Sequence, residues 1–295
     1  MKSIHRAGLF SILVMTAWAQ NPIRVLFLGG TDNAPAHNPR AMRDTLAPVL
    51  AANNMTMAYR DTQTVLNVDS LKQYDVLLLA TADHGSGTAG GSNLTTAQED
   101  ALIGWLNAGH VAVAFHGSTN TYLNNPRWVQ LLGAVFLDHG SVDNSGLATY
   151  TRPAHPSLTG TSVLPTSAVA TGGQPYWDEG RRHQNFVSDT VVLATARLGG
   201  GEIVPWIWVR PQGSGWVYYN SGGHDGQSWK LAQWKGQVVQ ALRWGASIPV
   251  RIQVGKNIRP VAEYKQGRIL TVNGRKTSTA SLRMRPRLRC CSIEF

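Results

Sequence analysis

Two histidines stand directly after short hydrophobic runs, where a strand of a buried sheet would end. His116 follows the apolar run 111–115, and His224 lies with Asp225 in a glycine-rich loop after the run 216–219. An imidazole titrates near neutral pH, so it can act as a general acid, a general base or a metal ligand. We expect His116 and His224 to be catalytic, with Asp225 orienting His224 by a hydrogen bond. The alternatives are a structural His116 and an ordinary turn stabilised by Asp225.

Other histidines and acids extend this set. His139, His155 and Glu179 are candidate metal ligands, because imidazole and carboxylate groups together suit a divalent ion such as zinc or manganese. Their spacing matches no compact zinc motif, so the ligands would have to converge through the fold.

Several other chemistries are not expected. Ser118 lies in no G-x-S-x-G nucleophile elbow, which argues against a serine hydrolase. The glycine-rich run 84–91 lacks both the P-loop ending and the G-x-G-x-x-G order, so we expect a surface loop or lid and no nucleotide cofactor. Only Cys290 and Cys291 occur, near the C-terminus, which leaves the body without a disulfide or a cysteine nucleophile.

Aromatic and glycine residues suggest where a ligand would bind. The chain has 10 Trp, and we expect Trp177, Trp208 and Trp229 to offer apolar faces to a sugar, the alternative being that they belong to the core. Gly29 and Gly30 follow the first hydrophobic run and are expected to line the same cleft.

Strand-like and helix-like segments alternate along the first half of the chain. Buried runs at 23–28, 55–59, 75–80 and 111–115 predict strands, and the apolar periodicity of 39–54 and 96–108 predicts helices, the second with a capping box from Thr96 and Glu99. Later segments predict a strand at 191–195, a hairpin of 204–209 with 215–219, and a closing helix at 229–244. This alternation predicts an α/β fold with a mainly parallel sheet, in which ligands bind beyond the carboxyl ends of the strands.

The charge of the chain lies at its two ends. The net charge of the 295 residues is +10, but residues 251–295 hold eleven basic and two acidic residues, whereas residues 20–250 hold 14 basic and 15 acidic ones. A nearly neutral body suits an uncharged sugar better than a nucleic acid, so no nucleic-acid partner is expected.

The N-terminal segment is typical of a secretory signal. Residues 1–19 combine Lys2 and Arg6, an apolar run at 8–17 and a small-residue site at Ala17-Trp18-Ala19. We therefore predict a signal peptide at 1–19 and export to a bacterial periplasm or beyond, with no later membrane span. The functional domain is expected at 20–250. The basic tail 251–295 would be a disordered extension, a surface anchor or the remnant of a sorting segment.

Motifs spread over residues 22–247 resemble the trehalose-utilisation (ThuA-like) family in composition and order. They are the segments 25–30, 74–79, 106–117, 192–195, 215–219 and 223–225, with Leu132-Gly133, Phe136, His139, His155-Pro156, Asp178-Glu179, Pro205, Ile207-Trp208 and Trp229.

The resemblance implies the flavodoxin-like, three-layer α/β sandwich of the class I glutamine amidotransferases. His116 would occupy the place of the amidotransferase cysteine, so thiolate hydrolysis of glutamine is not expected. The family points to trehalose-type or oxidised (keto) disaccharides and to a hydrolase, lyase or isomerase. A non-catalytic carbohydrate-binding or scaffold module on the same fold is the alternative. Two segments depart from the family pattern and leave the substrate open: Ala108-Gly109-His110, and 180–183, which is Gly-Arg-Arg-His where an apolar residue and a tyrosine are usual.

Overall fold

A computed structural model describes residues 21–30, 37–80, 93–139, 148–162, 167–169, 175–198 and 201–250. Its main feature is an eight-stranded sheet in the order β2-β1-β3-β4-β12-β11-β10-β6. The strands are β1 (Ile23–Leu28), β2 (Met55–Arg60), β3 (Val76–Leu79), β4 (Val111–Phe115), β6 (Thr149–Tyr150), β10 (Val191–Arg197), β11 (Ile203–Gln212) and β12 (Gly215–Asn220). The strands from β2 to β12 run parallel, and β12, β11, β10 and β6 pair antiparallel.

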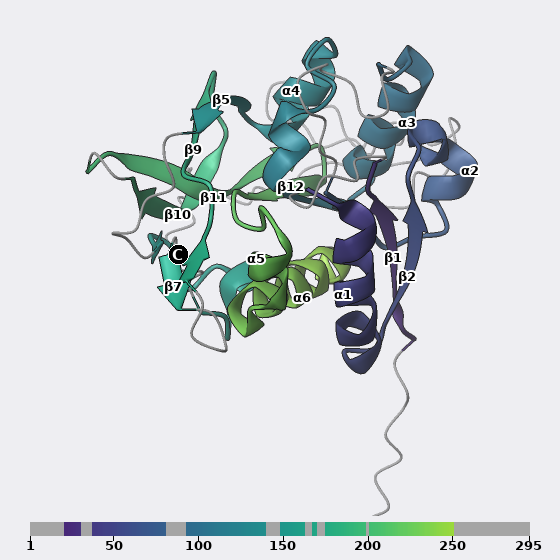
Figure 1. Ribbon diagram of the computed structural model, residues 1–295. Helices are drawn as coiled ribbons and strands as arrows, with labels where there is room; N and C mark the ends of the chain where they lie inside the picture. The colour runs from purple at the N-terminus through teal and green to yellow at the C-terminus, as the bar shows by residue number, and fades with distance from the viewer. Residues whose placement is uncertain are drawn as a thin grey trace, which may run out of the picture.

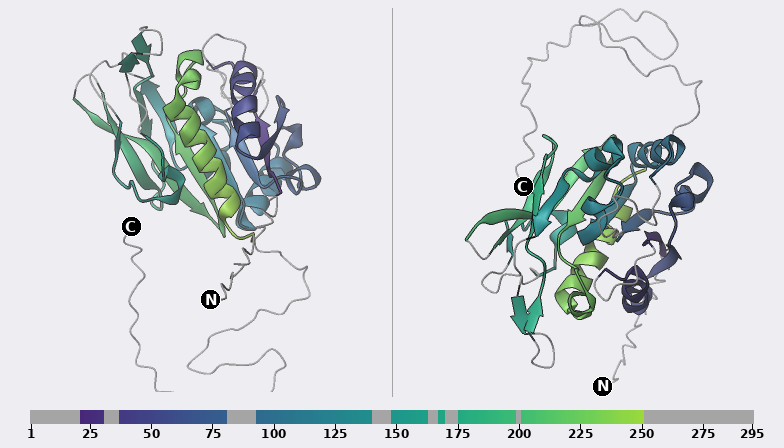
Figure 2. Two further views of the ribbon diagram at one scale, coloured as in Figure 1. Left: turned by 90° about the horizontal axis from the view of Figure 1, so that it is seen from below. Right: turned by 45° about the horizontal axis from the view of Figure 1, so that its top comes forward.

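Helices cover both faces of this sheet (Figures 1 and 2). One face carries α1 (Pro39–Ala52), α5 (Gly226–Lys230) and α6 (Ala232–Ser247), and the other carries α2 (Val68–Leu71), α3 (Thr96–Asn107) and α4 (Pro126–Leu132). The predicted three-layer α/β sandwich with a mainly parallel sheet is therefore confirmed. The smaller elements are η1 (Gln63–Val65), η3 (His116–Asn120) and η4 (Pro156–Leu158), and the pairs β5 (Val135–His139) with β9 (Arg181–Gln184) and β7 (Ser167–Val169) with β8 (Pro175–Trp177).

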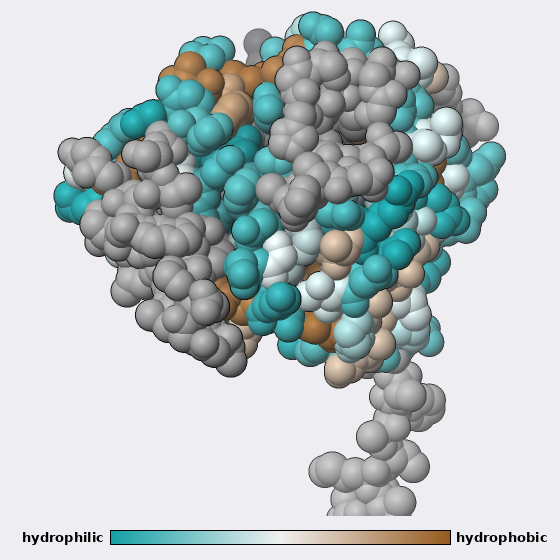
Figure 3. Space-filling model, in the orientation of Figure 1, coloured by the Kyte–Doolittle hydropathy of each residue, from teal (hydrophilic) through white to brown (hydrophobic). Residues whose placement is uncertain are grey.

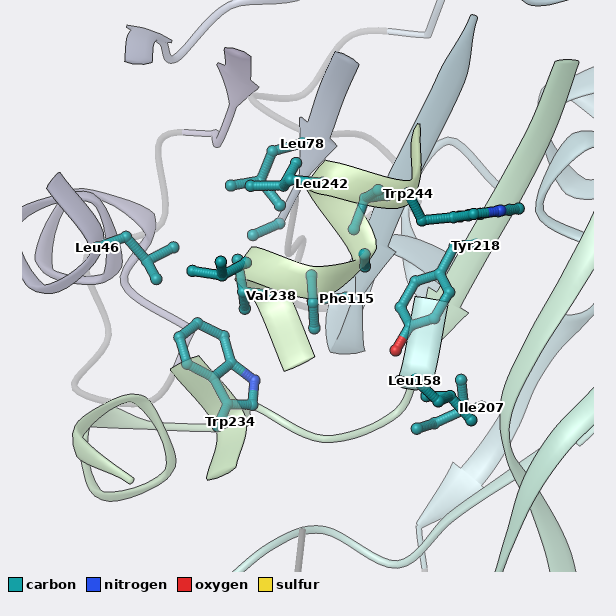
Figure 4. Close-up of a cluster of buried hydrophobic side chains, with 14 of the residues drawn as sticks. Leu46, Leu78, Phe115, Leu158, Ile207, Tyr218, Trp234, Val238, Leu242 and Trp244 are labelled. Carbon is teal, nitrogen blue, oxygen red and sulfur yellow. The ribbon is translucent and has the colours of Figure 1, made fainter. Parts of the chain in front are cut away.

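Alternating side chains of the strands feed two separate cores. Val111, Val113 and Phe115 of β4 join the cluster under α1 and α6, whereas Ala112 and Ala114 face α3 and α4. This alternation follows from the two-residue period of a strand, and burial on both faces explains the continuous apolar runs in the sequence. Figure 4 shows the first cluster, in which residues of α6 such as Val238 and Leu242 lie beside Phe115.

The capping box of α3 lies one residue earlier in the chain than the sequence pattern predicted. Thr95 is the N-cap residue of α3, and its side chain and that of Gln98 form the reciprocal capping box. Thr96 and Glu99, the predicted pair, lie inside the helix. Glu99 is buried and faces Asn125 and Arg127 instead. Two adjacent threonines, each followed three residues later by Gln or Glu, offer the same local signal in the sequence.

The predicted closing helix is divided into two. Leu231 adopts an extended conformation (φ −64°, ψ 133°) between α5 and α6. Asp225 caps the start of α5, and the extended Leu231 separates α5 from the long α6 that covers the sheet. The loop 221–225, which follows β12 directly, lies at the carboxyl end of that strand.

Two predicted segments lie outside the described residues: the signal peptide at 1–19 and the tail at 251–295. The glycine-rich run 84–91 also lies there. Within the described part of the chain, no helix combines the length and apolarity that crossing a bilayer requires. Most of the described residues on the face shown in Figure 3 are hydrophilic, and the apolar ones form small groups.

Candidate functional site

Three histidines and one glutamate converge beyond the carboxyl ends of the parallel strands. His37, His116, Glu179 and His224 each offer a nitrogen or oxygen atom, and these atoms all lie within 4.8 Å of one another. The four residues come from the segment before α1, the end of β4, the link from β8 to β9, and the loop after β12. This is the edge at which open α/β sheets bind their ligands.

His116 is held in an uncommon backbone conformation. Its φ is +41°, in the left-handed region that side chains other than glycine rarely adopt. The Tyr219 hydroxyl donates to the His116 carbonyl at 2.7 Å, and the Thr119 hydroxyl lies 3.4 Å from the same oxygen. His183 lies 3.1 Å from Tyr219 Oη and 3.2 Å from Thr119 Oγ1. These contacts hold the His116 carbonyl in place and offset part of the cost of this backbone conformation.

The tautomer of His116 follows from its neighbours. Nδ1 lies 2.8 Å from the carbonyl oxygen of Ser221, which can only accept, so Nδ1 carries the proton. Nε2 of the neutral ring therefore presents a lone pair. It lies 3.1 Å from His37 Nε2 and receives a hydrogen bond from Arg181 Nη1 at 3.0 Å. Burial and the Arg181 charge lower the His116 pKa to about 4, so the ring is neutral at pH 7.

Glu179 links the histidines to Arg181. Its Oε2 lies 2.9 Å from Arg181 Nη1 and 3.3 Å from His116 Nε2, and its Oε1 lies 3.4 Å from His224 Nε2. Burial opposes ionisation of this carboxyl, but the positive charge of Arg181 favours it, and the Glu179 pKa lies below its usual range. Burial also lowers the His224 pKa, against the attraction of Glu179. The cluster thus contains an ionised carboxylate beside the neutral imidazoles of His116 and His224.

Arg181 is a buried cation in this site. Its side chain is 3% exposed and its guanidinium lies 4.0 Å over the ring of Phe136. Nη1 donates to both His116 Nε2 and Glu179 Oε2, whereas Nε and Nη2 have no hydrogen-bond partner among the described residues. A buried guanidinium is costly unless its charge is paired, and the Glu179 carboxylate provides that pairing.

The loop after β12 depends on Gly223. Its φ is +105°, and a Cβ added there would lie 2.7 Å from Trp234 Nε1, so a larger residue would not fit. Asp178 accepts hydrogen bonds from the backbone of Gly223 and His224, at 3.0 and 3.4 Å. The loop is therefore fixed to the segment that carries Glu179.

Of the predicted site residues, the structure brings His116, His224 and Glu179 together. Asp225 lies next to His224 in the chain, but its carboxylate caps α5 by accepting from the backbone of Gln227 and Ser228 at 2.8 and 3.3 Å. These contacts fit the alternative of a turn stabilised by Asp225, and its orienting role stays a prediction.

The other two predicted metal ligands lie outside the cluster. His139 is exposed at the end of β5 and stacks on Phe136. His155 is buried against Trp244 and is the N-cap residue of η4, where Nδ1 accepts from the Ser157 backbone. A histidine that precedes a proline can serve as a helix cap as well as a ligand, which the sequence alone does not distinguish.

The predicted sugar-binding residues are placed as follows. Trp208 and Trp229 are buried, and their indole N–H groups donate to the Leu132 and Gly223 carbonyls at 2.8 Å, so neither ring face is open in this structure. The side chain of Trp177 lies outside what the structure describes. Gly29 lies at the end of β1 under the Tyr59 ring, where a Cβ would approach Tyr59 Oη to 2.5 Å, and the Gly30 carbonyl accepts from that hydroxyl at 3.2 Å.

Sequence reasoning missed His37 and gave Arg181 no role. His37 directly precedes Asn38, which caps α1, and Pro39, which begins it. A helix start that follows the first strand marks a loop at the carboxyl edge of the sheet, so this signal was present. Arg181 belongs to the segment 180–183 that departs from the family pattern.

Comparison with known proteins agrees with this fold. Residues 24–245 match the family described as ThuA, trehalose utilisation. A putative ThuA-like protein from Parabacteroides merdae superposes with a TM-score of 0.60 at 13% identity, covering 81% of this chain and 95% of its own. A second from Bacteroides uniformis has a TM-score of 0.53 at 17% identity, covering 77% and 93%. No curated protein gives a significant match. At these identities the likeness to solved structures concerns the fold.

Proposed function

The chain belongs to the trehalose-utilisation (ThuA) family, within the glutamine amidotransferase-like superfamily, and from this premise we propose that it is an exported carbohydrate-processing enzyme. Its proposed substrates are trehalose-type or oxidised (keto) disaccharides. The observation that supports an enzyme is the convergence of His37, His116, Glu179 and His224 at the ligand-binding edge of the sheet. Three imidazoles, a carboxylate and a buried guanidinium in one place are more than a fold requires.

The chemistry follows from the charges. A carbonyl group on a sugar ring acidifies the neighbouring C–H bond. An unprotonated imidazole nitrogen can accept that proton, while the electron pair of the C–H bond moves to the carbonyl oxygen as an enolate. His116 Nε2 and His224 are the candidate bases, and Arg181 supplies positive charge 3.0 Å from His116 Nε2. In an isomerase reaction the imidazolium would return the proton to the former carbonyl carbon, while the proton of the neighbouring hydroxyl passes to the enolate oxygen. In a lyase reaction the enolate would re-form the carbonyl as the glycosidic oxygen departs and takes the proton from the imidazolium.

The test uses the full chain with trehalose and its keto-oxidised forms, followed by chromatography and mass spectrometry of the products. His116→Ala and His224→Ala should abolish turnover and leave thermal unfolding nearly unchanged. His139→Ala removes an exposed histidine outside the cluster and should retain turnover. Loss of stability without a specific loss of turnover would make the histidines structural. Tight binding of unmodified glycans with no turnover by any variant would favour the non-catalytic carbohydrate-binding module.

Export has its own test. When the full chain is expressed in a bacterium, N-terminal sequencing of the protein recovered from the periplasm should begin at Gln20. A chain that stays in the cytoplasm with Lys2 and Arg6 intact would remove the export part of the proposal.

A further inference from the structure

The geometry points to a zinc-type divalent cation site formed by His37, His116, Glu179 and His224. This inference concerns the same site as the proposed function and gives it a cofactor. Its ligand set differs from the one that the sequence suggested, since it includes His37 and leaves out His139 and His155.

The distances between the donor atoms have the size of a tetrahedral coordination shell. Zinc binds imidazole nitrogen and carboxylate oxygen at roughly 2.0–2.2 Å, which places neighbouring donors of a tetrahedron about 3.3–3.5 Å apart. Two edges of this size belong to a shell that takes Glu179 Oε1 as its oxygen donor: His37 Nε2 to His116 Nε2 at 3.1 Å, and Glu179 Oε1 to His224 Nε2 at 3.4 Å. The other carboxylate oxygen, Oε2, lies 3.3 Å from His116 Nε2. Because one donor atom from each of the four residues lies within 4.8 Å of the others, modest side-chain movement would close them around one ion.

The surroundings of two ligands prepare them for a cation. The Ser221 carbonyl accepts a hydrogen bond from His116 Nδ1–H and so directs the Nε2 lone pair into the cluster, the arrangement that commonly orients a metal-bound histidine. Arg181 holds Glu179 through Oε2, which leaves Oε1 on the side of His224. These contacts fix the ring and the carboxylate before any ion arrives.

His37 and His224 are tied to each other by the backbone. The His37 N–H donates to the His224 carbonyl at 3.0 Å, and the two rings lie edge to face with centroids 4.7 Å apart. Asn38 then begins α1 by accepting from the backbone of Arg40 and Ala41. The helix start and this hydrogen bond bring a ligand from residue 37 next to one from residue 224.

An incoming cation would compete with Arg181 for the Nε2 lone pair of His116. Arg181 Nη1 donates to the Nε2 lone pair of His116 at 3.0 Å, and a cation would take that lone pair. Arg181 would keep its partner Glu179 Oε2 at 2.9 Å, so its charge would stay paired. A donor set of three imidazoles and one carboxylate favours zinc among common divalent ions, whereas magnesium and calcium prefer oxygen ligands.

The experiment measures metal binding by the full chain. The protein is stripped with a chelator and titrated with Zn²⁺ in competition with a chromophoric chelator, and elemental analysis gives the stoichiometry. We expect one Zn²⁺ per chain. His37→Ala and His224→Ala should each weaken binding by more than about tenfold, since losing even a partner that orients a ligand costs 10–100-fold.

Two matched variants control for the loss of a histidine as such. His139→Ala and His155→Asn lie outside the four donors and should leave the Zn²⁺ affinity within about twofold of the parent chain. Thermal unfolding of each stripped variant shows whether it is folded, and Co²⁺ absorption in the visible range reports tetrahedral coordination independently of affinity. Substoichiometric zinc, or equal losses in the controls and the ligand variants, would overturn the site.

The failures of the two proposals can be told apart. One bound Zn²⁺ lost in His37→Ala, together with no turnover of any sugar, would overturn the proposed function and leave the metal site standing. Turnover by a chain that binds no Zn²⁺ in the titration would overturn the metal site and leave the enzyme.

Discussion

Replacing Glu179 by Gln removes the anionic partner of a guanidinium that protein encloses almost completely. The side chains of Arg181 and Glu179 are 3% and 11% exposed, and Nη1 lies 2.9 Å from Oε2. Breaking a buried ion pair by removing one partner costs about 3–5 kcal/mol, because the remaining charge is left uncompensated. For a domain of this size, each kcal/mol lowers Tm by about 2–4 °C, so we expect Glu179→Gln to lower it by about 6–20 °C in chelator.

A second substitution separates the lost pair from other effects of the first. Arg181→Met in the Glu179→Gln background removes the unpaired charge while keeping an apolar side chain over Phe136. The double variant should therefore regain most of the lost stability, giving a favourable coupling between the two changes in a double-mutant cycle.

The matched control makes the same change in an exposed pair. Glu202 contacts Arg182 at 2.7 Å, but the side chains are 49% and 34% exposed. Glu202→Gln should change Tm little, because solvent screens the pair. Equal losses of Tm in Glu179→Gln and Glu202→Gln, or a double variant as unstable as Glu179→Gln alone, would refute the reasoning from burial.

Three further predictions concern the residues around the site and the far end of the fold. Asp225→Ala should destabilise the protein by about 1 kcal/mol in urea unfolding, through loss of the α5 cap. Asp225→Asn should retain both the cap and turnover, the latter measured by product analysis. Loss of turnover in a folded Asp225→Asn variant would instead support a catalytic role for Asp225. Gly223→Ala should cost about 1–3 kcal/mol, because φ is +105° and the new Cβ meets Trp234, whereas Gly226→Ala, whose Cβ has its nearest neighbour at 4.0 Å, should be tolerated in the same assay. Burial, and after it the charge of Arg152, lowers the His155 pKa from 6.5 to about 4. Between these pH values the unfolded chain binds a proton at His155 that the folded chain does not, so stability falls as the pH drops from 6.5 to about 4. The loss of unfolding free energy approaches about 2–3 kcal/mol near pH 4. His155→Asn keeps a capping acceptor, and its unfolding free energy should differ less between pH 7 and pH 4 than that of the parent chain. The same pH dependence in His155→Asn and the parent would contradict the assignment to His155.

The strands and helices that bury apolar faces could be predicted from the sequence, because their burial leaves a direct pattern. The run Val111–Phe115 and the stripe of α3 are examples, and their alternation led to the parallel sheet and its ligand-binding edge. His116 and His224 could be chosen by their positions at strand ends alone.

Features that depend on contacts between distant segments were harder to predict. Glu179 is followed by two arginines, and only the fold shows that Arg181 is buried with it while Arg182 faces Asp138 and Glu202 at the surface. Trp208 and Trp229 have the same residue type as a sugar platform, but their burial is decided by neighbours from α4 and the loop before α5. The break at Leu231 likewise has no glycine or proline to mark it.

The four donor residues are contributed by segments far apart in the chain, at positions 37, 116, 179 and 224. During synthesis, a nascent chain would lack a complete set until the residues after β12 had emerged and folded. A ligand of the assembled cluster would bind only the native state, and by mass action it would stabilise that state by an amount set by its free concentration relative to its dissociation constant. Occupancy of the cluster would then report completed folding, and the compartment in which the chain folds would determine which ions are available to it.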